Sequence, residues 1–267
     1  MHPERGTIRV GVGGWTYEPW RGNFYPTGLA QQRELEYASR KLTAIEINGT
    51  YYGTQKPESF ARWRAETPDG FVFSLKASRF ATNRRVLGEA GPAIEHFVHS
   101  GITRLGPKLG PILWQFMPTK RFEPEDFAAF LALLPREEEG APLRHVMEVR
   151  HPTFMTPEYL ALARRFKVAT VFSDTDEFPS FADVTGDFFY GRLQRSQADV
   201  ATGYATPALD AIADCARLWA SGGEPQVAPR IEAAQPPGPP RDVFLFFISG
   251  AKERAPAAAQ ALIERLG

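Results

Sequence analysis

The chain has 267 residues, of which 43% are hydrophobic and 12% aromatic. Lys and Arg together number 31, as do Asp and Glu, so the overall basic excess that favours non-specific nucleic-acid binding is absent. No apolar run reaches the roughly 18 residues of a membrane span, and the opening residues lack a signal peptide's apolar stretch. We therefore expect a cytoplasmic protein with no membrane partner. The single cysteine, Cys215, excludes an intrachain disulfide.

Short apolar runs typical of buried strands alternate with helical patterns along the whole chain. The expected strands are 8–14, 44–51, 71–78, 111–116, 145–150, 168–174, 187–194 and 243–249. The expected helices are 31–40, 58–66, 92–105, 124–134, 157–166, 207–220 and 256–266. Several helices open with a proline, whose missing N–H costs nothing in the first turn. Thr156 and Thr206 precede such prolines and are the expected N-caps.

This alternation predicts an α/β fold in which eight parallel strands close into a single-domain (β/α)8 TIM-type barrel, residues 1–267. The connection between the sixth and seventh strands, 175–186, has no helical pattern and is expected to be irregular. Residues 221–241 hold six prolines and three glycines and predict a Pro/Gly-rich surface loop within the barrel domain.

Polar residues of one parity interrupt several of the apolar strands. Because side chains alternate between the two faces of a strand, Ile45 and Ile47 would face the helices and leave Glu46 and Asn48 inside the barrel. The same parity, with the end of the sixth strand, adds to this inward set Ser74, Lys76, Gln115, Glu148, Arg150, Asp174, Tyr190, Arg192 and Gln194.

Buried charges cost several kcal/mol each unless they are paired, so these residues form either a self-neutralising network or a pocket for a polar ligand. Active sites of such barrels lie at the carboxyl ends of the strands, which favours the pocket for Asn48, Lys76, Arg150 and Arg192. For Glu46 and Glu148, one layer deeper, both interpretations stay open, because a carboxylate that orients an arginine is equally natural there.

An aromatic-rich segment follows the first strand. Trp15, Tyr17 and Trp20 are expected either to roof the pocket and stack on a planar ligand or to plug the barrel mouth. His151 follows Arg150 at the rim and is either an acid–base group or a loop residue fixed by the next proline. No HExxH or Gly-x-Ser-x-Gly motif occurs, and the sequence indicates no metal site and no particular cofactor.

Five blocks resemble the domain of unknown function 72 family, the YecE-like proteins: GVGGWTYEPWRGNFYP (11–26), EINGTYY (46–52), FSLK (73–76), LGPILWQF (109–116) and EVRH (148–151). The resemblance implies a (β/α)8 barrel and no established activity. Where members of that family usually have Arg-Leu-His-Gly on the seventh strand, this chain has Gln194 at the histidine position. Its last strand ends in Phe247-Ile-Ser-Gly rather than Phe-Asn-Asn-Asp, which places Ser249 where an amide is usual.

The leading hypothesis is an enzyme of unassigned reaction that acts on a small polar or anionic molecule. Lys76, Arg150 and Arg192 would supply the positive field, and Glu46 or Glu148 would be the general base if burial raises its pKa. A non-catalytic barrel that binds a ligand or partner is the first alternative. A nucleic-acid-processing protein that uses the aromatic segment with Arg79, Arg84 and Arg85 is the second, and we do not expect it. The sequence does not indicate an oligomeric state.

Overall fold

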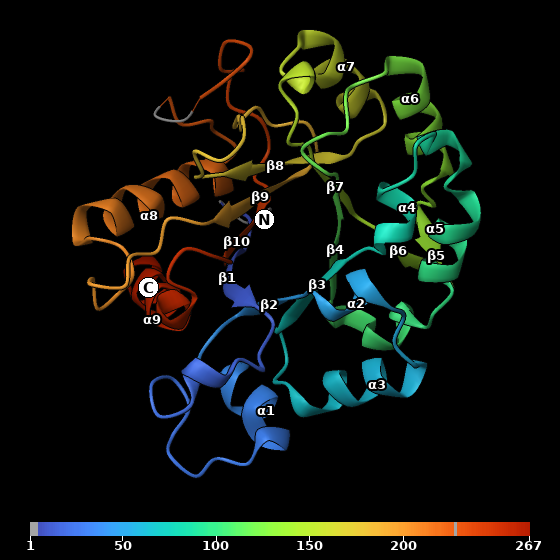
Figure 1. Cartoon of the computed structure of the whole chain (residues 1–267). Helices are drawn as coiled ribbons and strands as arrows, with labels where there is room; N and C mark the ends of the chain where they lie inside the picture. Colours follow the sequence, from blue (N-terminus) through green and yellow to red (C-terminus); the bar gives the residue numbers. More distant parts are fainter. Residues whose placement is uncertain (1–4, 227–228) are drawn as a thin grey trace.

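Eight parallel strands close into a barrel at the centre of the molecule, and their order around the barrel follows the chain (Figure 1). The computed structural model describes residues 5–226 and 229–267. The barrel strands are Ile8–Gly13 (β1), Ala44–Ile47 (β2), Val72–Lys76 (β3), Leu109–Gln115 (β4), His145–Glu148 (β7), Ala169–Ser173 (β8), Phe188–Leu193 (β9) and Asp242–Phe247 (β10). Pairing of β10 with β1 closes the ring. The predicted single-domain (β/α)8 barrel is confirmed.

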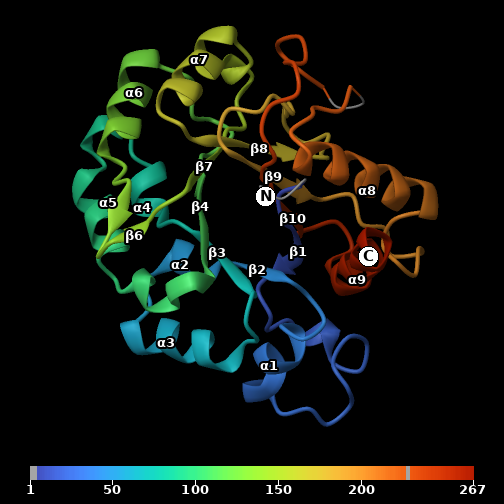
Figure 2. The same ribbon diagram turned by 180° about the vertical axis from the view of Figure 1, so that it is seen from behind.

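Helices surround this barrel on the outside, as two opposite views show (Figures 1 and 2). The longer ones are Pro57–Glu66 (α3), Gly91–Val98 (α5), Pro124–Leu133 (α6), Pro157–Arg165 (α7), Thr206–Ala220 (α8) and Ala255–Leu266 (α9). Shorter helices are Glu34–Ala38 (α1), Gly49–Tyr52 (α2) and Arg79–Thr82 (α4). Short 3-10 helices lie at Glu18–Trp20, Gln31–Arg33, Leu87–Glu89, Ile102–Lys108, Pro152–Phe154 and Lys252–Arg254. A small antiparallel pair, Glu137–Glu138 (β5) and Ala141–Pro142 (β6), was not expected from the sequence.

Two predicted elements are shorter than expected. The strand predicted over 44–51 ends at Ile47, because the chain turns into α2, where the Thr50 hydroxyl donates to the carbonyls of Ile47 and Lys76. The helix predicted over 92–105 is interrupted at Gly101, whose φ of 93° is left-handed and incompatible with a continuous helix.

One of the two expected N-caps is confirmed. The hydroxyl of Thr156 accepts a hydrogen bond of 3.3 Å from the backbone N–H of Tyr159 and caps α7. The cap predicted at Thr206 is wrong, because Thr206 is already the first residue of α8 and the preceding Ala205 has no side chain that could cap.

Two apolar cores stabilise the barrel. Between strands and helices, side chains of one parity form a large buried cluster that includes Ile45, Phe73 and Met147. Inside the barrel, side chains of the other parity form a second cluster. Its members include Ala44, Val72, Leu113, Val146, Phe188 and Phe244, most of which lie in the amino-terminal parts of their strands. The barrel interior is therefore filled mainly with apolar side chains at the amino-terminal ends of the strands, and the polar side chains lie toward their carboxyl ends.

No helix is formed between β8 and β9, as expected for residues 175–186. This irregular connection contacts the described part of the proline-rich loop 221–241, of which residues 227–228 lie outside the described residues. The buried carboxylate of Asp183 accepts hydrogen bonds of 2.9 and 3.0 Å from the N–H groups of Ile231 and Glu232. Over the described residues, no helix has the length and apolarity to cross a membrane.

Candidate functional site

On several barrel strands the inward side chains change from apolar to polar toward the carboxyl end. On β2 the inward residues run from Ala44 to Glu46, and Asn48 follows the end of the strand. On β9 they run from Phe188 through Tyr190 to Arg192. Because carboxyl ends of parallel strands meet at one mouth, these side chains converge there. The parity argument correctly placed these side chains inside the barrel, whereas the inward position expected for Asp174 is wrong, because Asp174 has the opposite parity to Val171 and faces α8.

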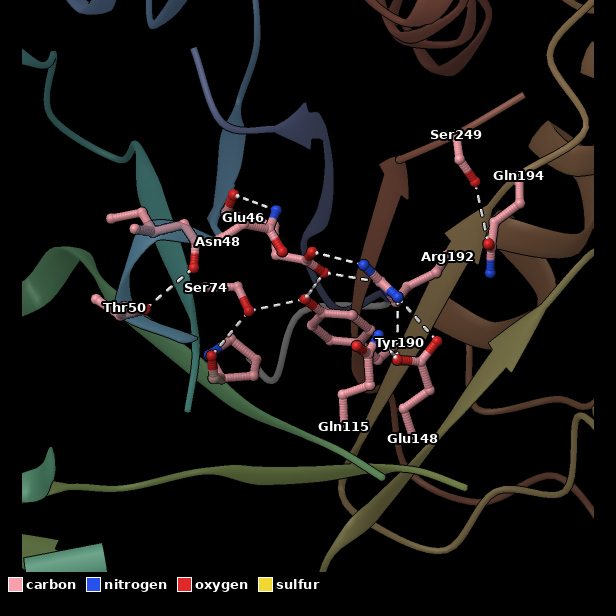
Figure 3. Close-up of polar contacts among 12 residues, drawn as sticks. Glu46, Asn48, Thr50, Ser74, Gln115, Glu148, Tyr190, Arg192, Gln194 and Ser249 are labelled. Atoms are coloured by element: carbon pink, nitrogen blue, oxygen red, sulfur yellow. Dashed lines mark hydrogen bonds and ion pairs between the residues drawn. The ribbon is translucent and has the colours of Figure 1, made fainter. Parts of the chain in front are cut away.

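Arg192 lies between the carboxylates of Glu46 and Glu148 and binds both (Figure 3). Its Nε and Nη2 atoms donate to the two oxygens of Glu46 at 3.1 and 3.0 Å. Its Nη1 atom donates to the two oxygens of Glu148 at 2.8 and 3.0 Å. All three residues are at most 2% exposed, so this is a buried network that bridges β2, β7 and β9.

Neighbouring polar groups complete the hydrogen bonding of these carboxylates. The hydroxyl of Tyr190 donates to Glu46 at 2.8 Å and is itself 2.8 Å from the hydroxyl of Ser74. On the other side, Gln115 donates to Glu148, as does Arg150 Nη2 at 3.1 Å. The self-neutralising network anticipated for the two glutamates is therefore present at the floor of the site.

This pairing decides the protonation of Glu148. Burial opposes its ionisation, but the guanidinium groups of Arg192 and Arg150 outweigh that effect and lower the pKa of Glu148 to about 2. A carboxylate with so low a pKa is a weak base at neutral pH. The condition set for Glu148 as a general base, a pKa raised by burial, is therefore not met, because Arg192 and Arg150 outweigh the effect of burial. Burial acts against the charge of Arg192 as well, yet the two carboxylates raise its pKa.

A cavity of about 600 Å³ opens above this network. Its polar lining consists of cations, amides and the hydroxyl residues Thr16 and Tyr52, and no described Asp or Glu is among the lining residues. These residues are Gly13, Gly14, Trp15, Thr16, Ile47, Asn48, Gly49, Tyr52, Gln55, Trp63, Lys76, Gln115, Arg150, Arg192, Gln194, Ile248 and Lys252. Gly13 leaves room for the site, since a Cβ there would lie 3.1 Å from Asn48 Nδ2.

Two lysines of the cavity wall have no carboxylate partner among the described residues. The ammonium group of Lys76 lies 4.3 Å from the ring centre of Tyr51, and that of Lys252 lies 4.7 Å from the ring centre of Tyr17. Burial lowers the pKa of Lys76 to about 8, with Arg192 adding to the effect. Burial also lowers the pKa of Lys252. The cavity therefore presents positive charge that the protein does not neutralise itself.

The predicted aromatic roof is only partly present. Trp15 lines the cavity, but Trp20 is fully buried beside it, with its indole N–H donating to the carbonyl of Lys252 at 2.9 Å. Tyr17 packs on Trp20 with ring centres 5.5 Å apart and supports the wall behind Lys252. Stacking of a ligand on Trp20 is therefore wrong, because tertiary contacts already cover that ring.

Two further expected site residues lie away from the cavity lining. His151 accepts a hydrogen bond from the N–H of Thr153 at 3.2 Å and caps a 3-10 turn, which corresponds to the loop interpretation. Asp174 lies on the other side of β9, where it accepts hydrogen bonds from the Gln194 N–H and from the Tyr204 hydroxyl at 2.7 Å. Burial raises the pKa of Asp174 to about 6.

The two positions that depart from the family pattern contact each other. The hydroxyl of Ser249 donates to the side-chain oxygen of Gln194 at 3.0 Å (Figure 3). The Nε2 group of Gln194 is buried and lacks a hydrogen-bond partner among the described residues. Gln194 and Ser249 thus form a hydrogen-bonded pair at one edge of the cavity, which Gln194 lines.

Several lining residues were not identified from the sequence. Lys252, Gln55, Tyr52 and Trp63 come from loops or helices outside the strand pattern. Strand parity carries no information about such positions. The one available signal was that Tyr52 and Lys252 closely follow predicted strands, where the loops that build barrel sites begin.

The comparisons with known proteins agree on the family. The model of the family described as "Protein of unknown function DUF72" matches residues 9–267. The chain is similar to the UPF0759 protein YecE of Escherichia coli K12, with 29% identity over 150 residues, which cover 55% of this chain and 50% of YecE. It is also similar to the UPF0759 protein YunF of Bacillus subtilis, with 25% identity over 122 residues, 42% of this chain and 40% of YunF. The matched region thus spans half or less of each of these relatives.

Among solved structures, a DUF72 family protein from Thermotoga maritima has a TM-score of 0.71 and 20% identity, and the match covers 96% of this chain and 97% of that one. This likeness shows a shared barrel fold. Because the family model matches nearly the whole chain, the protein belongs to the DUF72 family of proteins of unknown function.

Proposed function

We propose that this protein binds a small organic anion, such as a carboxylate or a phosphate ester, in the cavity at the carboxyl ends of the strands. The observation that carries the proposal is the imbalance of charge around the cavity. Lys76 and Lys252 line it without a carboxylate partner, and no described acidic side chain reaches its surface. A desolvated cation stabilises an anion far better than an exposed one does, because the effective dielectric constant is lower.

Unsatisfied hydrogen-bond donors support the same ligand class. The Nε atom of Arg150 and the Nε2 atom of Gln194 are buried without acceptors among the described residues. Both belong to cavity-lining residues, and no lining residue has a buried acceptor that lacks a donor. Buried polar groups are nearly always paired, so a ligand with acceptor atoms would be favoured if its binding turned these two donors toward the cavity.

The network below the cavity supports a fixed rather than an adaptable site. Glu46, Arg192 and Glu148 are locked by mutual hydrogen bonds and position Arg150 and Gln115 at the wall. A preorganised site loses little entropy when it binds its ligand. This arrangement suits an enzyme as well as a binding protein, and the two differ in whether a reacting group is present.

The proposal is tested by thermal unfolding of the full chain in the presence of phosphate, sulfate and small mono- and dicarboxylates. An anion at 100 times its Kd should stabilise the fold by about 2.7 kcal/mol. Lys252→Met should weaken that anion about tenfold or more, since a charged hydrogen bond contributes about 1.5–3 kcal/mol. Lys41→Met is the matched control, because Lys41 is exposed and precedes β2 at the opposite end of the barrel. Equal shifts in both variants would overturn the proposal.

A second candidate, binding of single-stranded nucleic acid, is favoured by one feature of the rim. Tyr52 and Phe80 are 64% and 60% exposed, and the guanidinium of Arg79 lies 5.5 Å from the centre of each ring. Exposed rings next to arginine suit base stacking. This candidate predicts affinity for an oligonucleotide that falls steeply with salt and is lost in Tyr52→Ala. Retention of affinity at high salt would exclude it.

A further inference from the structure

Two lysines of this protein are almost equally buried and have opposite surroundings. Lys108 is 6% exposed, and its ammonium group donates to the carbonyls of Arg64 and Thr67 at 2.7 and 2.6 Å and to the Thr67 hydroxyl at 3.1 Å. Lys76 is 8% exposed, yet its Nζ atom has no hydrogen bond and no ion pair with any described residue. The ammonium group of Lys108 is thus hydrogen-bonded within the protein, as expected of a structural lysine, whereas that of Lys76 is not.

The surroundings of Lys76 disfavour its charged form. Its ammonium group lies over the face of the Tyr51 ring, and the positive charge of Arg192, which lines the same cavity, acts against its protonation. Glu46 and Glu148 attract the ammonium only in part, because both carboxylates are engaged by Arg192. Since the pKa of Lys76 is about 8, an appreciable fraction of this amine is neutral at physiological pH.

We propose that Lys76 is a nucleophile that forms an imine with the carbonyl carbon of a small aldehyde or ketone bearing an anionic group. The proposal rests on the anion site inferred above and adds the reacting group. The neutral Nζ attacks the carbonyl carbon and forms a C–N bond as the C=O π bond breaks, and the oxygen takes up a proton while Nζ gives one up to the solvent. The resulting carbinolamine then breaks its C–O bond, its oxygen takes up a second proton and leaves as water, and Nζ gives up its remaining proton. The product is a C=N bond to Lys76, with no oxidant or reductant consumed.

Other cations of the cavity are available to bind the anionic group of the substrate while Lys76 attacks its carbonyl carbon. Arg150 and Lys252 line the same cavity and supply charge for the anionic group, which leaves Lys76 for the carbonyl carbon. The backbone of Lys76 is held at the end of β3, where its carbonyl accepts a hydrogen bond of 2.7 Å from the Thr50 hydroxyl. A lysine on a rigid strand end, partly desolvated and beside other cations, has the environment that activates an amine for imine formation.

Borohydride trapping tests the proposal on the full chain. The protein is incubated at neutral pH with pyruvate, glyoxylate or a phosphorylated aldehyde, reduced with borohydride and mapped by peptide mass spectrometry. We expect a reduced adduct at Lys76 at least about tenfold above that at exposed Lys41, because the lowered pKa of Lys76 increases the neutral fraction of its amine. Lys76→Arg keeps the positive charge but has no nucleophilic amine, so it should abolish the site-specific adduct.

The possible results separate the two proposals. An anion that stabilises the fold, together with no adduct at Lys76 from any of the carbonyl compounds, would overturn the nucleophile and leave the anion site standing. Neither stabilisation nor adduct would overturn both. Adducts spread over the lysines according to their exposure would also contradict the special role of Lys76. Excess adduct at Lys76 in the wild type and in Lys41→Met would support it.

Discussion

Arg192 and Glu148 form a buried ion pair in which one guanidinium nitrogen lies 2.8 and 3.0 Å from both carboxylate oxygens. The same guanidinium binds Glu46 through its two other nitrogens, so a single arginine is hydrogen-bonded to two carboxylates inside the barrel. This arrangement keeps Glu148 ionised, and Lys76 lines the cavity with a pKa lowered to about 8. The consequences for stability and chemistry can be measured separately.

Removal of Arg192 should strongly destabilise the fold. Arg192→Met leaves Glu46 and Glu148 buried and short of a cation, and a broken buried pair of this kind costs about 3–5 kcal/mol. Urea unfolding at pH 7 measures the loss. Glu36→Gln, in the exposed pair with Arg33, is the control and should change the midpoint far less. Equal losses for the two variants would contradict the buried network.

The acid limb of the stability curve should depend on Glu148. Its pKa in the folded protein is about 2, below the ordinary value of 4.5, so its contribution is complete above about pH 5 and is lost as the pH falls toward 2. The free energy of unfolding of the wild type should therefore decline over this window more steeply than that of Glu148→Gln, which cannot titrate. Parallel declines in the two proteins would show that Glu148 is not held ionised by its arginines.

Replacement of Lys76 should make the protein more stable at neutral pH. The pKa of Lys76 is lowered to about 8 from 10.5, so the folded state disfavours the charged amine. Lys76→Met should raise the free energy of unfolding at pH 7 by about 1–3 kcal/mol, given about 1.4 kcal/mol per pKa unit. The advantage should shrink between pH 8 and 10.5, because the wild type gains stability as its lysine loses the proton. A lower free energy of unfolding in Lys76→Met would instead indicate that Lys76 stabilises the fold, as expected of a hydrogen-bonded structural lysine such as Lys108.

Ionisation of Asp174 should lower the stability of the fold, whereas ionisation of Glu148 raises it. Burial raises its pKa from 3.8 to about 6, so its contribution to stability is complete below about pH 4 and is lost as the pH rises through 6. Asp174→Asn should abolish this decline, since an amide stays neutral and its oxygen can still accept from the Gln194 N–H. The measurement is the difference in unfolding free energy between the two proteins from pH 4 to 7. A constant difference would contradict the raised pKa.

Strand parity predicted the barrel and the inward polar residues because both depend on local alternation. Ile45 and Ile47 fix the outer face of β2, and Glu46 follows from them. The burial of Trp20 could not be predicted, because its indole pairs with a carbonyl 232 residues further along the chain. The low pKa of Glu148 depends on an arginine of another strand, 44 residues away. Such pairings become visible only when the barrel is closed.

The cavity at the carboxyl ends of the strands is the proposed anion site. The most direct test is a crystal structure of the protein grown with selenate, whose position is read from its anomalous signal. An anomalous peak within hydrogen-bond distance of Lys76, Arg150 or Lys252, inside the cavity, is the predicted result. Selenate bound only at surface positions, with none in the cavity although its side chains are well ordered, would contradict the proposed anion site.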